Sequence, residues 1–374
     1  MNELWERALA LAKGQSPSAS AIQRVASATS SEASAWAFAQ WDLRTRARSK
    51  FALAEQMLFA REALEQATHE KVAAYHASLF PPEALVADLT TGIGADLIAL
   101  ASRGPAVGFE LDEFRADFAR HNLRVHGLDA IVQTTDCLTA NWDFDFAFAD
   151  PSRRVESRRT LDPSEFSPDP TVVATRFGEL KLGVMKLSPL LSDPFLTQLG
   201  PRLEFLSYGG ECREAVVIAG SDATAGRVAV HVESGSILES CLPPPQVELP
   251  RRFLYDADPA AVRAHAIGTL CELFGLSPLG DSNGYLTGDD LIRSPWLRPY
   301  EVQYHGKSDV KSTRKALRDV GGTVFEIKQR GVKADVEKLK KELGFEGKLL
   351  LSLVLWPIGS SLRHTLVSAA PIHD

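Results

Sequence analysis

Four short segments that we expect to be strands, in the first half of the chain, each end in a carboxylate. The segment ALVAD ends at Asp88, PAVGFE at Glu110, IVQTTD at Asp136 and FDFAFAD at Asp150. Stretches of helical composition, ADLIALAS and EFRADFARHNLRV, follow the first two. Short strands that alternate with helices predict a parallel sheet covered on both faces. Because ligands of such sheets bind at the carboxyl ends of the strands, we expect the four acids to line one cleft.

The turn after the first segment, DLTTGIGAD at residues 88–96, restricts which ligands the cleft can bind. Gly92 and Gly94 lack a Cβ atom, so the backbone there can turn tightly and come close to a bound group. Asp88 and Thr90 precede the turn, and Asp96 can cap the following helix or reach the ligand. The sequence therefore predicts a compact binding turn between a strand and a helix.

A dinucleotide is the first ligand to weigh at this turn. Its fingerprint needs a third glycine so that a pyrophosphate can sit on the helix N-terminus, and Leu97 occupies that position. Asp88 also carries a negative charge close to where a diphosphate would approach. A ligand with a cationic amino group and no phosphate, such as S-adenosylmethionine, fits these residues better. Glu110 can accept hydrogen bonds from both ribose hydroxyls, which either ligand carries.

The segments DLTTGIGAD, GFELD, TTDCL and ADPSRR resemble motifs one to four of the class I S-adenosylmethionine-dependent methyltransferases, over about residues 84–240. The stretch LEQATHEKVAAYHA, together with DLTTGIGAD and DPSRR, is similar to a bacterial group of RNA methyltransferases with a C-terminal THUMP-like domain. RRFLYDADPAAVRA, GYLTGD and VFEIKQRGV fit the C-terminal part of that group. The resemblance implies a Rossmann-like α/β sheet with an N-terminal helical segment and a C-terminal α+β domain.

The resemblance also implies roles for individual residues. Asp88, Gly92 and Gly94 would cradle the methionine part of the cofactor, Glu110 the ribose and Asp136 the adenine. A segment that closes over the cofactor in relatives of trimethylguanosine synthase matches Gln66 and Thr68, which are otherwise ordinary polar residues at a helix end. The expected cofactor-binding set is Gln66, Thr68, Asp88, Thr90, Gly92, Gly94, Asp96, Glu110 and Asp136.

The fourth acid begins the sequence Asp150-Pro151-Ser152-Arg153-Arg154. Amino-group methyltransferases usually carry Asp or Asn, two prolines and an aromatic residue here, and this chain lacks the second proline and the aromatic. An arginine side chain can stack on a base in place of the missing aromatic residue. Alternatively, the target is not an exocyclic amine. We therefore take Asp150, Pro151 and Arg153 as catalytic candidates. The arginines Arg153, Arg154, Arg158 and Arg159 either hold phosphates or form a solvated loop.

The chain divides by composition into three regions. Residues 1–80 have helical composition and end at Pro81-Pro82, residues 81–245 hold the strand–helix alternation, and residues 246–374 follow the linker at Pro243 to Pro245. Within the second region we expect ECREAVVIAG and GRVAVHVE to be late antiparallel strands and residues 155–170 to be a long loop. In the third we expect helices at 259–274, 308–319 and 334–342, a strand GTVFEIKQ and a final strand KLLLSLVLW.

Charge and residue spacing exclude several classes of site. The net charge is −7, yet residues 298–342 hold 12 Lys or Arg against 7 Asp or Glu, which suits a basic RNA-binding module on an acidic body. The four cysteines and nine histidines show no metal-ligand spacing, so we expect no metal. No apolar run is long enough to cross a membrane, and MNELWERALALAKG has the charge pattern of an amphipathic helix. A cytoplasmic location is therefore expected.

The leading hypothesis is an enzyme that transfers a methyl group from S-adenosylmethionine to tRNA or ribosomal RNA and releases S-adenosylhomocysteine. Its C-terminal domain would present the RNA. An RNA-binding protein with a degenerate methyltransferase domain is one alternative, favoured by the missing aromatic but opposed by the acids at 88, 110 and 136. A methyltransferase that acts on a substrate other than RNA is the second alternative.

Overall fold

The structure is a computed structural model that describes residues 3–155, 158–344 and 347–370. Contacts divide the chain into two compact units, each described here by itself. The first unit is Met1–Leu187, Pro194–Gly200 and Val217–Ala223, and the second is Ser188–Asp193, Pro201–Val216 and Thr224–Asp374.

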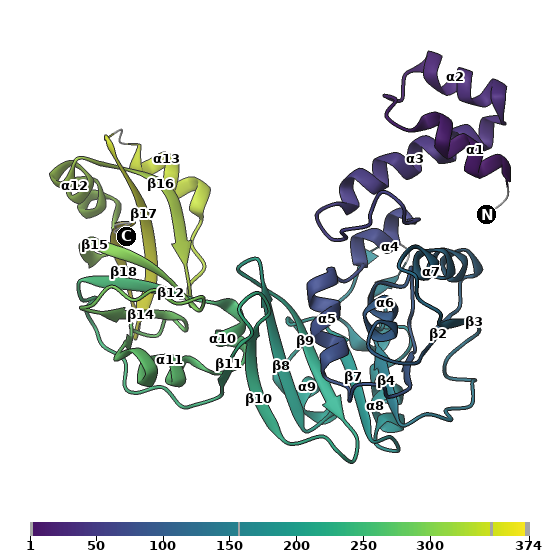
Figure 1. Cartoon of the computed structure of the whole chain (residues 1–374). Coiled ribbons are helices and arrows are strands. Elements are labelled where there is room, and N and C mark those ends of the chain that lie inside the picture. The colour runs from purple at the N-terminus through teal and green to yellow at the C-terminus, as the bar shows by residue number, and fades with distance from the viewer. Residues whose placement is uncertain (1–2, 156–157, 345–346, 371–374) are drawn as a thin grey trace. The chain divides into compact units, whose positions relative to one another are not determined.

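Five helices open the first unit, as the composition of residues 1–80 predicts. They are α1 (Glu3–Ala12), α2 (Ala19–Ala28), α3 (Ser31–Ala47), α4 (Arg61–Gln66) and α5 (Glu70–Ser78), all labelled in Figure 1. Serine caps begin two of them, because the Ser18 and Ser30 hydroxyls accept hydrogen bonds from backbone N–H groups three residues on. Helices α1 to α3 pack through a shared apolar cluster that is rich in buried alanine, whose small side chain permits close helix approach.

A parallel sheet follows, as the strand–helix alternation predicts. Its strands are β1 (Val86–Asp88), β2 (Ala106–Glu110), β3 (Ile131–Thr134), β4 (Phe146–Ala149) and β7 (Leu182–Leu187). They lie in the order β3-β2-β1-β4-β7, and every neighbouring pair is parallel. Helices α6 (Ala95–Ala101) and α7 (Glu113–Val125) pack on β1 to β3, and α8 (Pro170–Phe177) packs on β7. The carboxyl ends of β1, β2 and β4 therefore meet at one edge of the sheet.

The segment between β4 and α8, which we expected to be a loop, is partly ordered into regular structure. Strands β5 (Arg154–Val155) and β6 (Arg158–Arg159) pair antiparallel, and a 3₁₀ turn, η1, spans Pro163–Glu165. Ser152 and Ser167 close the base of this segment by exchanging two backbone hydrogen bonds of 2.8 and 3.0 Å. The side chains of Arg154, Arg158 and Arg159 lie outside those that the structure describes.

The large sheet continues through β8 (Arg202–Tyr208), β9 (Glu211–Ala219), β10 (Gly226–His231) and β11 (Ser236–Glu239), and its full strand order is β11-β10-β8-β9-β7-β4-β1-β2-β3. We expected both β9 and β10 to be antiparallel strands, and for β10 this holds on one side only, because it pairs antiparallel with β11 but runs parallel to β8. A two-residue turn, Gly209-Gly210, joins β8 to β9, and only antiparallel neighbours can use so short a turn. The chain then returns beside the other edge of β8, so a second reversal makes β10 parallel to it.

A second sheet of seven strands forms the α+β part of the second unit, in the order β13-β14-β12-β15-β18-β17-β16. Its strands are β12 (Phe253–Ala257), β13 (Ser277–Pro278), β14 (Tyr285–Gly288), β15 (Leu297–Lys307), β16 (Gly322–Gln329), β17 (Leu349–Ile358) and β18 (Ser361–Ala369). Helices α12 (Val310–Val320) and α13 (Val336–Leu343) pack on the sheet through an apolar cluster that includes Leu317, Leu343 and Leu353.

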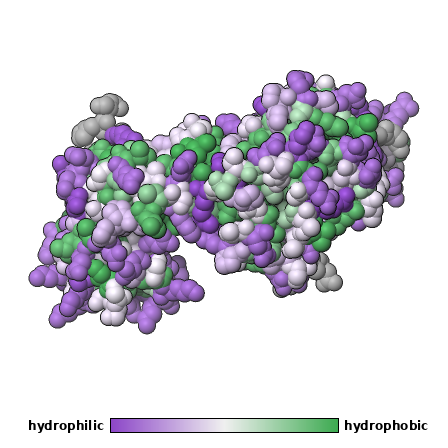
Figure 2. Space-filling model, turned by 90° about the horizontal axis from the view of Figure 1, so that it is seen from below, coloured by the Kyte–Doolittle hydropathy of each residue, from purple (hydrophilic) through white to green (hydrophobic). Residues whose placement is uncertain are grey.

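Two sequence expectations for this region are wrong. The helix expected at 259–274 is two helices, α10 (Pro259–Arg263) and α11 (Ile267–Phe274), because His265 between them adopts a φ of 57° that no helix permits. The strand KLLLSLVLW is not the last, since β18 follows it after a short turn. The surface in Figure 2 is mostly hydrophilic, with smaller hydrophobic areas scattered over the face in view, as expected when most apolar side chains are buried.

Candidate functional site

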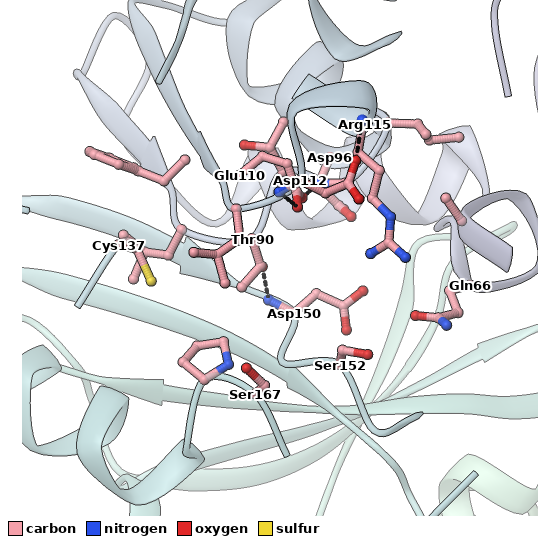
Figure 3. Close-up of a pocket in the computed structure, with 18 of the residues that line it drawn as sticks. Gln66, Thr90, Asp96, Glu110, Asp112, Arg115, Cys137, Asp150, Ser152 and Ser167 are labelled. Carbon is pink, nitrogen blue, oxygen red and sulfur yellow. Dashed lines mark hydrogen bonds between the residues drawn. The ribbon is translucent and has the colours of Figure 1, made fainter. Parts of the chain in front are cut away.

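A cavity of about 330 Å³ opens at the carboxyl ends of β1, β2 and β4. Of the expected cofactor-binding and catalytic residues, those whose atoms line it are Gln66, Thr68, Thr90, Gly92, Asp96, Glu110, Asp136 and Asp150 (Figure 3). The others, which lie behind or beside its wall, are Asp88, Gly94, Pro151 and Arg153. Its volume is at the lower end of the roughly 300–1,000 Å³ typical of pockets for small ligands.

The glycine turn forms one wall because both glycines adopt left-handed backbone conformations. Gly92 has a φ of 57° and Gly94 a φ of 91°, which residues with a Cβ atom rarely adopt. A Cβ on Gly92 would meet no atom within 4 Å, so it would extend into open space at the cavity wall. Gly94 instead begins α6 and approaches Ala119 of α7. Gly92 thus shapes the wall, and Gly94 lets the helices come together.

Two carboxylates on this wall are held by backbone N–H groups. Glu110 Oε2 accepts from Gly92 N at 2.8 Å, and Glu110 Oε1 accepts from Asp112 N at 3.0 Å. Asp136 Oδ1 accepts from Leu138 N at 2.8 Å. A carboxylate oxygen can accept more than one hydrogen bond, so each fixed acid keeps acceptor capacity toward the cavity. Such acceptors suit ligands that present hydroxyl or amino groups.

Asp88 lies buried beneath the turn, and 1% of its surface is exposed. Its Oδ1 accepts from Thr90 N at 3.1 Å, whereas Oδ2 has no hydrogen-bond partner within the described part of the chain. Burial, followed by the charges of Asp96, Asp150 and Glu110, raises the pKa of Asp88 well above its usual value, although the Thr90 N–H opposes this. A hydrogen-bond donor or a positive charge next to Asp88 Oδ2 would stabilise the ionised carboxylate.

Asp150 reaches the cavity from the tip of β4. Its backbone N–H donates to Thr90 Oγ1 at 2.6 Å, which joins the tips of β1 and β4, and its carboxylate points into the cavity (Figure 3). Ser152, Ser167 and Pro168 from the base of the following segment line the same side. The backbone pairing of Ser152 with Ser167 thus places this segment next to Asp150.

A chain of hydrogen bonds that the sequence did not predict supports Asp150. Lys186 of β7 donates from Nζ to Asp150 Oδ2 at 2.6 Å and to Thr68 Oγ1 at 2.9 Å. Thr68 donates to Asp96 Oδ2 at 2.7 Å, and His76 Nδ1 lies 2.8 Å from Asp96 Oδ1. Burial alone would raise the pKa of Asp96, but His76, Lys186 and Thr68 outweigh it and lower that pKa. A lysine inside the apolar strand LGVMKL is the signal that could have indicated this partner.

Arg115 of α7 is a second residue that sequence reasoning missed. Its guanidinium turns into the cavity from the side of Asp112, facing the space next to Gln66 and Asp150 (Figure 3). Among the described residues that line the cavity, it is the one with a permanent positive charge. A single arginine in EFRADFARHN carries no sequence signal, because a surface helix ordinarily has such charges.

Residues 3–155, 158–344 and 347–370 contain no group of three or more His, Cys, Asp or Glu placed to hold a metal ion. Within the same ranges, each helix is too short or too polar to span a bilayer.

Comparison with known proteins identifies the family. Residues 297–371 match the family model for a THUMP domain-like region. The chain is 32% identical over 316 residues to an uncharacterised S-adenosylmethionine-dependent methyltransferase of Mycobacterium tuberculosis (strain CDC 1551 / Oshkosh), covering 83% of this chain and 87% of that protein. The counterpart in strain H37Rv matches equally.

A solved structure supports the fold over the whole chain. A protein from Porphyromonas gingivalis W83 described as a methyltransferase superposes with a TM-score of 0.78, at 20% identity, covering 98% of each chain. The expected fold class, a Rossmann-like sheet with N-terminal helices and a C-terminal THUMP-like α+β region, is therefore confirmed. The chain belongs to the S-adenosylmethionine-dependent methyltransferases, and its cofactor is S-adenosylmethionine.

Proposed function

We propose that this enzyme methylates a nucleotide in tRNA or ribosomal RNA and that its C-terminal domain presents the RNA. The main support for the proposal is that one chain has both a cavity with several acids at the strand ends and a THUMP-like segment at 297–371. We retain residues 1–80, 81–245 and 246–374 as the proposed helical, methyltransferase and THUMP-like regions. The RNA substrate makes the cytoplasm the proposed place of action.

The side chains around the cavity fit an adenosyl sulfonium ligand. The unpartnered, buried Asp88 Oδ2 suits a cationic amino group, Glu110 the ribose hydroxyls, and Asp136 the adenine amino group. Arg115 supplies the positive charge that the methionine carboxylate needs in a cavity whose other charged lining residues are acids. Gln66 and Thr68 line the cavity and would close over the methionine part, with Thr90, Gly92, Gly94 and Asp96 forming the turn.

S-adenosylmethionine, when bound, supplies an electrophilic methyl group whose sulfur keeps the electrons of the broken bond and becomes the thioether of S-adenosylhomocysteine. The protein's own residues contribute by positioning the nucleophile against the cofactor. Asp150 accepts a hydrogen bond from the nucleophile, which holds a lone pair toward the cofactor. Ser152 and Ser167 border the space that the target nucleotide would enter, and Pro151 and Arg153 fix the backbone next to it.

Exposed cations on the C-terminal helices support RNA as the substrate. Helix α12 exposes Lys311, Lys315 and Arg318, and α13 exposes Lys338, Lys340 and Lys341. Arg314 of α12 donates to the backbone carbonyls of Glu342 and Leu343, which holds the two helices together. Lysine and arginine on one rigid pair of helices suit binding to phosphates, which supplies affinity without sequence preference.

The test combines cofactor and RNA binding with product analysis. Calorimetry with S-adenosylmethionine should give binding for the wild type and none for Gly92→Arg, whose side chain would enter the cavity. Filter binding with bulk tRNA and ribosomal RNA should show affinity that falls steeply with salt. Mass spectrometry of nucleosides from a deletion strain should show one methylated nucleoside missing. No RNA affinity at low salt would instead indicate a substrate other than RNA.

A further inference from the structure

We propose that Lys186 is a positioning residue for methyl transfer, which holds the Asp150 carboxylate as an oriented anion and ties it to Thr68 at the cofactor side of the cavity. The inference rests on the proposed role of Asp150 toward the nucleophile. Lys186 lies outside the cavity wall, so it would act through Asp150 and not by touching the substrate.

The geometry places Lys186 behind Asp150. It projects from β7, next to β4 in the sheet, and its side chain is 15% exposed against 29% for Asp150. Its Nζ lies 2.6 Å from Asp150 Oδ2, a short distance typical of a charge-assisted hydrogen bond. The second contact, 2.9 Å to Thr68 Oγ1, spans 118 positions of sequence and connects β7 to the segment before α5.

The surroundings give this pair its importance, because four further carboxylates lie on the elements around Asp150. The titratable and charged groups on the elements around it are Asp88 of β1, Asp96 of α6, His76 of α5, Glu110 of β2, Asp136 after β3, Arg115 of α7, Arg153 after β4 and Lys186 of β7. Without the Lys186 ammonium group, less positive charge would offset the repulsion between Asp150 and these carboxylates, so the proton affinity of Asp150 would rise.

The chemistry needs an oriented acceptor more than a strong base. The lone pair of the nucleophile forms the new bond to the methyl carbon, and the electrons of the old bond stay on sulfur. The alkylated nucleophile then carries a positive charge and releases its proton to water. A carboxylate kept ionised by Lys186 accepts the nucleophile's hydrogen bond throughout, and its fixed oxygen determines where that nucleophile sits.

The first test measures Asp150 directly and needs no RNA. Protein labelled with ¹³C at the aspartate carboxyl carbons is titrated by NMR, and the Asp150 signal is assigned by its loss in Asp150→Asn. We expect Lys186→Met to move the Asp150 midpoint upward by at least one pH unit and Lys186→Arg to restore most of it. An unchanged midpoint would overturn the proposal. Lys186→Gln replaces Lys186→Met if circular dichroism shows that the latter is unfolded.

A matched control is available on the same sheet. Lys181 and Asp145 form an ion pair of 2.8 Å in which both side chains are more than half exposed. Lys181→Met removes an ion pair at the amino ends of β4 and β7, whereas Asp150 follows the carboxyl end of β4, so it should leave both the Asp150 midpoint and the transfer rate unchanged. If it changes them as much as Lys186→Met does, the effect is a general one of lost charge.

The second test measures transfer from radiolabelled S-adenosylmethionine to RNA of a deletion strain. Lys186→Met should lower kcat about a hundredfold, move the acidic limb of the pH profile upward, and leave the Kd for S-adenosylhomocysteine within about threefold. Equal losses of transfer and of cofactor affinity would contradict a role through Asp150. If the wild type methylates no RNA, the RNA proposal fails, while the NMR titration still decides the role of Lys186.

Discussion

The proposed pairing of Arg115 with the cofactor carboxylate can be tested by changing both partners. Arg115→Met keeps the length and apolar stem of the side chain but removes its charge. Hydrogen bonds to charged groups contribute about 1.5–3 kcal/mol when buried. Because Arg115 is only half-buried at the cavity mouth, we expect about 1 kcal/mol, or roughly fivefold to tenfold in Kd.

Calorimetry with two ligands isolates the contact. S-adenosylmethionine has the carboxylate, and decarboxylated S-adenosylmethionine lacks it but keeps the amine, the sulfonium and the adenosine. Arg115→Met should weaken binding of the first by the stated factor and leave the second within about twofold. Equal weakening of both ligands would refute the pairing, because the arginine would then act on the cavity's shape. Arg124→Met, at an exposed arginine of the same helix that does not line the cavity, is the matched control.

Three further predictions address transfer, stability and RNA. Asp150→Ala should keep cofactor affinity within about threefold while methyl transfer falls at least about a hundredfold, measured by calorimetry and radiolabel transfer; an equal loss of both would mean that Asp150 serves the cofactor. Burial lowers the pKa of His364 from 6.5 to about 4, so the folded state disfavours its proton. Neutral His364 therefore contributes fully to the free energy of unfolding above about pH 6.5, and up to roughly 3 kcal/mol of it is lost as the pH falls toward 4. Urea unfolding should give a lower free energy of unfolding at pH 5 than at pH 7 in the wild type, and a smaller difference in His364→Phe. Lys338→Glu with Lys341→Glu should weaken binding of bulk tRNA and reduce the slope of log affinity against log salt, and an unchanged slope would place the RNA elsewhere.

The sequence was sufficient for the fold because its signals there are local. Each acid at 88, 110, 136 and 150 ends or closely follows a short strand, and parallel strands bring such ends together without further information. The direction of β10 was not predictable in the same way. Whether β10 is parallel or antiparallel to its neighbour depends on which strand it lies beside, and that choice is made by packing rather than by the period of GRVAVHVE.

The residues that line the cavity were predicted better than the residues that hold them in place from behind. Gly92 and Glu110 belong to one short motif, whereas Lys186 meets Thr68 only because two distant segments fold together. The lysine inside the apolar strand LGVMKL is a local signal without a partner, and a lone arginine in a surface helix is no signal, so the roles of Lys186 and Arg115 become clear only from their neighbours in space. His76 likewise lies in a segment that the resemblance covers, but its contact with Asp96 is tertiary.

The pairing of Ser152 with Ser167 has a consequence for how such an enzyme can diversify. Two backbone hydrogen bonds close a stretch of chain at its root, so changes of sequence or length beyond that root need not be transmitted to Asp150. Backbone groups make the closure, so it does not depend on which side chains the stretch carries. A replaced tip could therefore alter what enters the cavity mouth while the reacting geometry stays as it is.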